Sequence, residues 1–282
     1  MPPLFVVGSP RSGTTVVTQH IFNTFEFAYI SNYVKKHFRI PAIASVISRL
    51  KGVSNRAYDS RLGVVKGETS ISDGWALFEQ WFPGFNYHDA DGSGFLRTAN
   101  PNRLAALLRF IERIYSAPVL VKNNGNSLRI DSLSNLFQSA IFVHVERDLV
   151  STSSSLIRAR HKRGVGKGDW WTTVPEPILS LSFESEAERA VVQSWAVREA
   201  ARRSLTALSP DRYITIEYDA FCDDPDGVIR WVEAKYLAHA VRLKRVSNCL
   251  DPTIENRAPP PLVSEADVER FVARAKRQLA AT

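Results

Sequence analysis

Apolar and polar residues are arranged along the chain in blocks that predict strands and helices in turn. Short runs rich in strand-forming apolar residues occur near positions 4–7, 62–65, 119–121, 141–145 and 213–218. Runs of this length are typical of strands buried in a parallel sheet. Between them, residues 102–116 and 184–208 repeat apolar positions at helical spacing. The alternation predicts an α/β fold, with a parallel sheet flanked by helices on both faces.

The chain has 282 residues, which is enough for one large α/β domain with a sizeable core. No Gly/Ser-rich linker, low-complexity tract or internal repeat divides it. We therefore expect a single domain over residues 1–282.

The first apolar run leads directly into the loop G-S-P-R-S-G-T-T at residues 8–15. Gly8 and Gly13 have the G-x-x-x-x-G spacing of a P-loop, whose backbone N–H groups and following helix N-terminus bind a phosphate-like anion. A Walker A motif has Lys directly after the second glycine, but here that residue is Thr14. The basic residue of the loop is instead Arg11.

This loop resembles the phosphosulfate-binding loop of sulfotransferases that use phosphoadenosine phosphosulfate (PAPS). The resemblance implies a P-loop-like sulfotransferase fold and transfer of a sulfuryl group from PAPS, with phosphoadenosine phosphate (PAP) as the other product. It also implies that the donor is bound by the side chains and amides of the loop, namely Arg11, Ser12, Gly13, Thr14 and Thr15.

A second segment is similar to the same family. Arg147 follows the strand predicted at 141–145, and Ser155 comes eight residues later. This R-x-x-x-x-x-x-x-S spacing resembles the family signature that binds the phosphate on the ribose of PAPS. A guanidinium fork and a hydroxyl are suited to a phosphate.

Two further segments suggest the catalytic groups. The sequence K-N-N-G-N-S-L-R at 122–129 resembles a K-x-P-x-x-x-x-R segment of the family, and it places Lys122 beside the reacting group. Asn124 stands where the cytosolic animal enzymes have a catalytic His.

The G-E-T-S segment at 67–70 resembles a family segment that supplies a carboxylate, so Glu68 is the predicted general base, acting with Arg11 and Lys122. The alternatives are that Glu68 only caps a turn, or that His20 or His88 is the base.

The composition indicates the charge of the ligand and the cellular compartment of the protein. A net charge of +7 and a pI near 9.5 suit a polyanionic ligand. Cys222 and Cys249 match no metal spacing or disulfide framework, so we expect no metal cofactor and a reducing, cytoplasmic compartment. No apolar run is long enough to span a bilayer, and no nucleic-acid motif is present.

The acceptor is expected to be a hydroxyl or amine of a small molecule, a sugar or a lipid. The aromatic residues concentrated at 75–88 are one place for its pocket. Two other functions stay open. One is a P-loop kinase or NTPase with Glu146 as its Walker B acid, and the other is a non-catalytic nucleotide-binding protein.

Overall fold

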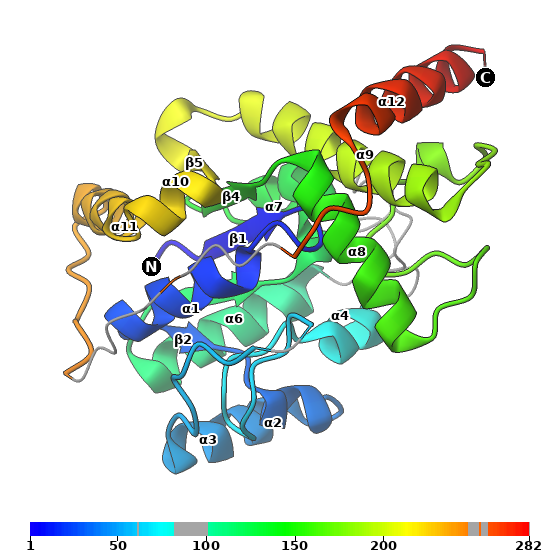
Figure 1. Cartoon of the computed structure of the whole chain (residues 1–282). Coiled ribbons are helices and arrows are strands. Elements are labelled where there is room, and N and C mark those ends of the chain that lie inside the picture. Colours follow the sequence, from blue (N-terminus) through cyan, green and yellow to red (C-terminus); the bar gives the residue numbers. More distant parts are fainter. Residues whose placement is uncertain (61, 82–100, 248–253, 255–258, 282) are drawn as a thin grey trace.

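One parallel sheet of five strands forms the centre of the chain (Figure 1). The computed structural model describes residues 1–60, 62–81, 101–247, 254 and 259–281. The strands are β1 (Leu4–Gly8), β2 (Ala28–Tyr29), β3 (Val119–Lys122), β4 (Ile141–Glu146) and β5 (Tyr213–Glu217), in the spatial order β2-β3-β1-β4-β5.

The order of the strands creates a crevice at the carboxyl end of β1. The strands beside β1 are β3 on one side and β4 on the other, and Val6 pairs with both Lys122 and Val143. The strand order therefore reverses at β1, and in open α/β sheets this switch point is where ligands bind.

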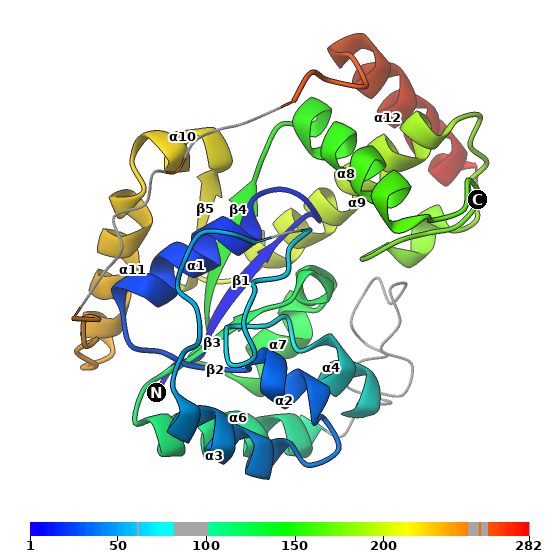
Figure 2. The ribbon, with the colours of Figure 1, turned by 60° about the horizontal axis from the view of Figure 1, so that its bottom comes forward.

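Helices cover both faces of the sheet (Figures 1 and 2). Because successive strand residues face opposite ways, Leu4 and Val6 belong to one core and Phe5 and Val7 to another. The first core includes α1 (Thr14–Thr24), α10 (Tyr218–Asp223) and α11 (Asp226–Ala238). The second includes α6 (Pro101–Tyr115), α7 (Ile130–Leu136) and α9 (Glu186–Thr206).

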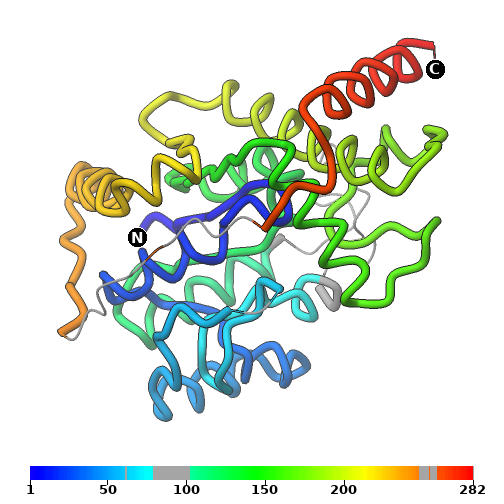
Figure 3. The backbone as a smooth tube through the Cα atoms, in the orientation of Figure 1, coloured from blue at the N-terminus to red at the C-terminus, as the bar shows by residue number. Residues whose placement is uncertain are grey.

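Two smaller groups of helices extend the central layers. The helices α8 (Leu149–Arg163) and α12 (Glu265–Ala280) pack against α9. The helices α2 (Asn32–Lys36), α3 (Pro41–Lys51) and α4 (Trp75–Trp81) form the other group, in which α2 packs against both α3 and α4, and α3 packs against α6. Short 3-10 turns are η1 (Asn124–Leu128), η2 (Glu176–Ile178) and η3 (Pro210–Arg212). Figure 3 shows the N-terminus beside α11 and the C-terminus at the opposite end of the molecule.

The predicted strand at 62–65 is wrong, whereas the other four are confirmed. Leu62 and Gly63 form a turn with positive φ angles of 52° and 83°, which prevents an extended strand. The fifth strand is instead β2, from the buried apolar run at 27–30.

Other local predictions are confirmed. The helical spacing at 102–116 and 184–208 corresponds to α6 and α9. A capping box begins α12, where Ser264 and Asp267 bond reciprocally. Residues 82–100, including His88 and most of the aromatic segment, lie outside the described residues.

Candidate active site

The loop between β1 and α1 has the geometry of an anion-binding turn. Gly13 lies just before α1 in the left-handed conformation, and it provides no side-chain cap for that helix end. The first N–H groups of α1 therefore keep their bonding capacity for a ligand. Gly13 also approaches an aromatic side chain, since a Cβ atom there would lie 2.1 Å from the Tyr218 ring. Only glycine fits this position.

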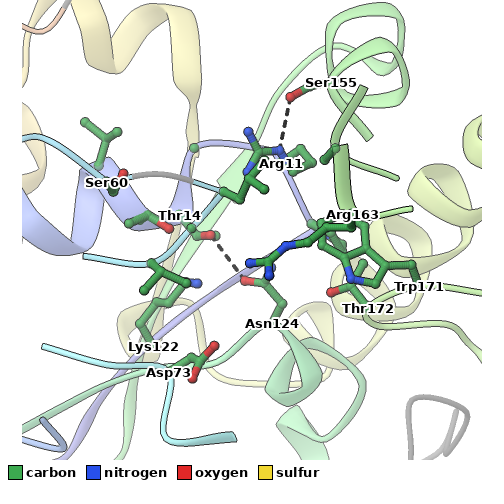
Figure 4. A pocket seen from close by; sticks show the side chains of 18 of the residues that line it. Arg11, Thr14, Ser60, Asp73, Lys122, Asn124, Ser155, Arg163, Trp171 and Thr172 are labelled. Atoms are coloured by element: carbon green, nitrogen blue, oxygen red, sulfur yellow. Dashed lines mark hydrogen bonds between the residues drawn. The ribbon is translucent and has the colours of Figure 1, made fainter. Parts of the chain in front are cut away.

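Arg11 joins the loop to α8. Its backbone is left-handed, with φ of 74°, which is uncommon outside glycine and directs the side chain toward α8. The Nε atom donates a hydrogen bond to Ser155 Oγ at 3.1 Å (Figure 4). Burial and the nearby charge of Arg147 lower the pKa of the Arg11 guanidinium. Two positive groups are thus held close together, an arrangement that favours an anion between them.

Arg147 lies at the carboxyl end of β4, where its guanidinium stacks over the Tyr218 ring at 4.8 Å from the ring centroid. Tyr218 also forms the wall behind Gly13. This one aromatic side chain therefore positions both the second glycine of the loop and the second predicted arginine.

On the other side of the loop, β3 ends at Lys122, whose side chain is buried. Burial lowers the pKa of the Lys122 ammonium, and the charge of Asp73 opposes that shift. Thr14 Oγ1 donates a hydrogen bond to Asn124 Oδ1 at 3.2 Å (Figure 4). The sequence left Asn124 without a role, and the structure shows that it connects η1 to the phosphate loop.

Asp73 is held next to these groups by three contacts. Its Oδ1 atom accepts hydrogen bonds from Lys35 Nζ at 2.8 Å and from the Trp75 backbone N–H at 3.2 Å. Asn123 Nδ2 fixes the Asp73 backbone carbonyl at 3.0 Å. Burial tends to raise the pKa of Asp73, but the charges of Lys122 and Lys35 outweigh it, so that the net pKa is lowered. Asp73 is therefore a charged carboxylate within the site.

Apart from Asn123, the residues described above line a cavity of about 810 Å³ at the switch point of the sheet. Seven basic residues line it: Arg11, Lys35, Lys122, Arg147, Arg158, Lys162 and Arg163. Among the described lining residues, Asp73 is the only carboxylate. The cavity is therefore strongly cationic, and its volume is in the range of small-molecule and cofactor sites.

The structure brings together most of the residues predicted for the site. The lining includes Arg11, Gly13, Thr14, Thr15, Lys122, Arg147 and Ser155. Ser12 lies buried behind the loop, where its backbone N–H donates to the Ser9 carbonyl. A backbone turn places residues 11–15 within a few ångströms of each other, so this part of the site could be predicted from local sequence. Lys122, Arg147 and Ser155 join it only through the packing of β3, β4 and α8 around β1.

Glu68, the predicted base, is placed elsewhere. Its carboxylate is about half exposed and accepts a hydrogen bond from Lys51 Nζ at 2.8 Å, which lowers the pKa of Glu68. It is absent from the cavity lining. The physical reason is the missing strand at 62–65, because the turn there carries Glu68 to the surface instead of to the edge of the sheet.

His20, an alternative base, is also outside the lining. The ring is buried, with Nδ1 3.1 Å from Tyr58 Oη and Nε2 3.5 Å from Asp226 Oδ1. Asp73 is the carboxylate that the sequence analysis missed. Its only local signal is an Asp two residues before a helix, which is equally typical of a simple cap.

Neither a metal cluster nor a membrane helix is found in the described part of the chain. No group of three or more His, Cys, Asp or Glu side chains there could hold a metal ion. None of the described helices combines the length and apolar character that crossing a bilayer requires.

The sequence model of the sulfotransferase family matches residues 2–235. The chain belongs to the sulfotransferase family. No curated protein sequence matches this sulfotransferase. The parallel sheet flanked by helices is the fold of this family.

Solved structures of bacterial sulfotransferases share the fold. The sulfotransferase STF9 from Mycobacterium avium has a TM-score of 0.56 and 16% identity, and the match covers 99% of this chain and 68% of that one. A sulfotransferase domain from the curacin biosynthetic pathway has a TM-score of 0.52 and 14% identity, covering 98% of both chains. The sulfotransferase STF1 from Mycobacterium tuberculosis H37Rv has the same TM-score and identity, covering 100% of this chain and 77% of that one.

Proposed function

We propose that this sulfotransferase moves a sulfuryl group from PAPS to a hydroxyl or amine of a small-molecule, sugar or lipid acceptor, releasing PAP. The observation that carries the proposal is the cationic cavity in which the phosphate loop and the Arg147 segment meet. PAPS combines a phosphosulfate with a separate ribose phosphate, so it presents two anionic groups. Two linked basic sites are suited to such a donor.

The two halves of the cavity would bind different parts of the donor. Arg11 and the amides at the start of α1 would hold the phosphosulfate, because they converge on the loop. Arg147 and Ser155 would hold the ribose phosphate. The hydrogen bond between Arg11 and Ser155 fixes the spacing of the two halves.

In the transfer step, the acceptor oxygen or nitrogen forms a bond to sulfur as the bond between sulfur and the phosphate oxygen breaks. Negative charge then develops on that leaving oxygen, and the buried ammonium of Lys122 with the guanidinium of Arg11 would stabilise it. The acceptor must also lose its proton. A carboxylate close to these cations can receive it.

We assign this role to Asp73 in place of Glu68. Asp73 Oδ1 takes both hydrogen bonds recorded for the carboxylate, from Lys35 and Trp75. Oδ2 accepts none from the described residues, so it can accept a proton from a bound acceptor. Lys122 and Asp73 line the same cavity, which supports their proposed roles as the cation for the leaving group and the base (Figure 4).

The kinase alternative has less support, because Glu146 is already engaged. Its carboxylate accepts two hydrogen bonds from Arg202 and lies 3.4 Å from His144 Nδ1. Glu146 is also absent from the cavity lining. A Walker B acid would need a free carboxylate facing the nucleotide. The cytoplasmic location and the absence of a nucleic-acid ligand stay predictions from the sequence.

The test is ligand-dependent stabilisation followed by transfer. PAP should raise the melting temperature of the protein more than ATP with Mg²⁺ does, because a ligand that binds the folded state stabilises it. Sulfur-labelled PAPS should then label a component of a metabolite extract, which mass spectrometry identifies by the gain of one sulfo group. Stabilisation by ATP with Mg²⁺ and not by PAP would favour a kinase or NTPase instead.

A further inference from the structure

The outer face of α3 is apolar. Ile43, Val46 and Leu50 are 59%, 38% and 82% exposed, and their spacing of three and four residues places them on one side of the helix. Ile40, directly before the helix, is 51% exposed. The outer side of a surface helix is normally polar. The stability of the fold therefore does not explain why these exposed residues are apolar.

The opposite side of α3 already forms the fold contacts. Ala44, Ser45 and Ser48 are buried, and the helix packs against α2 and α6. Ser48 also donates a hydrogen bond to Ser31 Oγ at 2.8 Å. The small residues thus face inward and the large aliphatic residues face outward, the reverse of what folding alone favours.

The segment that carries the stripe is also strongly basic. Residues 27–58 contain six Lys and Arg residues and no Asp or Glu. Lys35 and Lys51 are paired with Asp73 and Glu68, which come from the neighbouring segment. Lys36, Arg39 and Arg49 are exposed and take part in none of the ion pairs among the described residues.

We propose that the α3 face, defined as Ile40, Ile43, Val46 and Leu50 with Lys36, Arg39 and Arg49, binds the surface of an anionic lipid bilayer. An amphipathic helix with large aliphatic residues and flanking Lys or Arg lies in the interface of such a bilayer, with its apolar side among the acyl chains. The basic residues then meet the anionic headgroups.

Charge distinguishes this partner from a second copy of the chain. A symmetric dimer through the α3 face would bring Lys36, Arg39 and Arg49 of both copies together. The nearby carboxylates of Glu68 and Asp73 are already paired with Lys51 and Lys35. No residue of the α3 face lines the proposed active-site cavity, although Lys35 of the neighbouring α2 does. The membrane proposal therefore does not depend on the sulfotransferase reaction.

The test is sedimentation of the full chain with vesicles. The native protein should sediment with vesicles of equal parts phosphatidylcholine and phosphatidylglycerol, and not with phosphatidylcholine alone. Raising the salt concentration should weaken binding, because headgroup charge is screened. The Ile43→Glu/Leu50→Glu variant should lose about tenfold or more of the bound fraction at limiting lipid.

Two other variants keep the test decisive. Leu237→Glu changes an exposed leucine on α11, outside the α3 face and 53% exposed, and this variant should bind vesicles as the native protein does. Lys36→Gln/Arg49→Gln keeps the apolar stripe but removes two positive charges, so its binding to the phosphatidylglycerol vesicles should weaken and depend less on the salt concentration. Native-level binding by Ile43→Glu/Leu50→Glu overturns the proposal. So does a native dimer that this variant converts to a monomer, because the face would then be a contact between copies.

Discussion

Arg11 Nε donates a hydrogen bond to Ser155 Oγ at 3.1 Å, although 144 residues separate them in sequence. The first residue belongs to the phosphate loop and the second to α8, so the bond joins the two halves of the proposed donor site. Burial and the nearby charge of Arg147 both lower the pKa of Arg11, so positive charge is concentrated in the site before any ligand enters. The proposed donor site is therefore preorganised for a polyanion.

Replacing Arg11 with Ala should lower sulfuryl transfer by about a hundredfold or more, because it removes a donor directed at developing charge. The rate of sulfur transfer from labelled PAPS measures this effect. Arg11→Lys keeps the positive charge but loses the paired N–H donors of the guanidinium, so we expect an intermediate rate of transfer. Near-native turnover by Arg11→Ala would remove Arg11 from the mechanism.

Replacing Arg147 with Ala should weaken PAP binding by about 1.5–3 kcal/mol, the usual value of a hydrogen bond to a charged group. Titration calorimetry with PAP and with adenosine phosphosulfate, which lacks the ribose phosphate, measures the specificity of the loss. Binding of the second ligand should change little. Equal losses for both would mean that Arg147 acts only through its stacking on Tyr218.

Replacing Asp73 with Asn should lower transfer by about a hundredfold while PAP binding is retained, because the change removes the basic carboxylate and little volume. Asp73→Glu, which keeps the carboxylate, should retain part of the rate. Glu68→Gln makes the corresponding change at the surface carboxylate five residues earlier. If Glu68→Gln lost activity and Asp73→Asn did not, the base would be Glu68 after all.

The pH dependence separates a carboxylate base from a histidine. Lys122 and Lys35 lower the pKa of Asp73, so its carboxylate stays charged at every pH above the ordinary value for Asp. A base works when it is deprotonated, and we therefore expect no acid limb in kcat/KM between about pH 6 and 8. A rate that fell as the pH dropped through about 6.5 would indicate a histidine base instead.

Replacing Gly13 with Ala should destabilise the protein by roughly 2–5 kcal/mol, the sum of a left-handed residue and an overpacked contact. The Cβ atom would lie 2.1 Å from the Tyr218 ring. Gly164 is the matched control, since it is also left-handed but has no atom within 4 Å of an added Cβ. Gly164→Ala should cost only about 1–2 kcal/mol in urea unfolding. Equal losses of unfolding free energy in the two variants would show that the Tyr218 ring moves aside to accommodate the added methyl group.

The sequence by itself determined the features that depend on neighbouring residues. A strand, a glycine turn and a helix start follow one another within residues 4–15, so local conformation alone directs the amides and Arg11 toward one point. The predicted pair Arg147 and Ser155 likewise lies on one strand end and the first turns of one helix. Four of the five strands could be read from apolar runs for the same reason.

Only the tertiary structure decided which carboxylate reaches the cavity. Glu68 and Asp73 are five residues apart in a segment without regular structure, and no local pattern distinguishes them. Contacts with Lys35 and Asn123, from elements distant in sequence, turn Asp73 inward, while Lys51 holds Glu68 at the surface. The two-residue strand β2 was missed because its extended conformation depends on pairing with β3. In both cases the deciding interactions are long-range, and a local sequence pattern does not contain them.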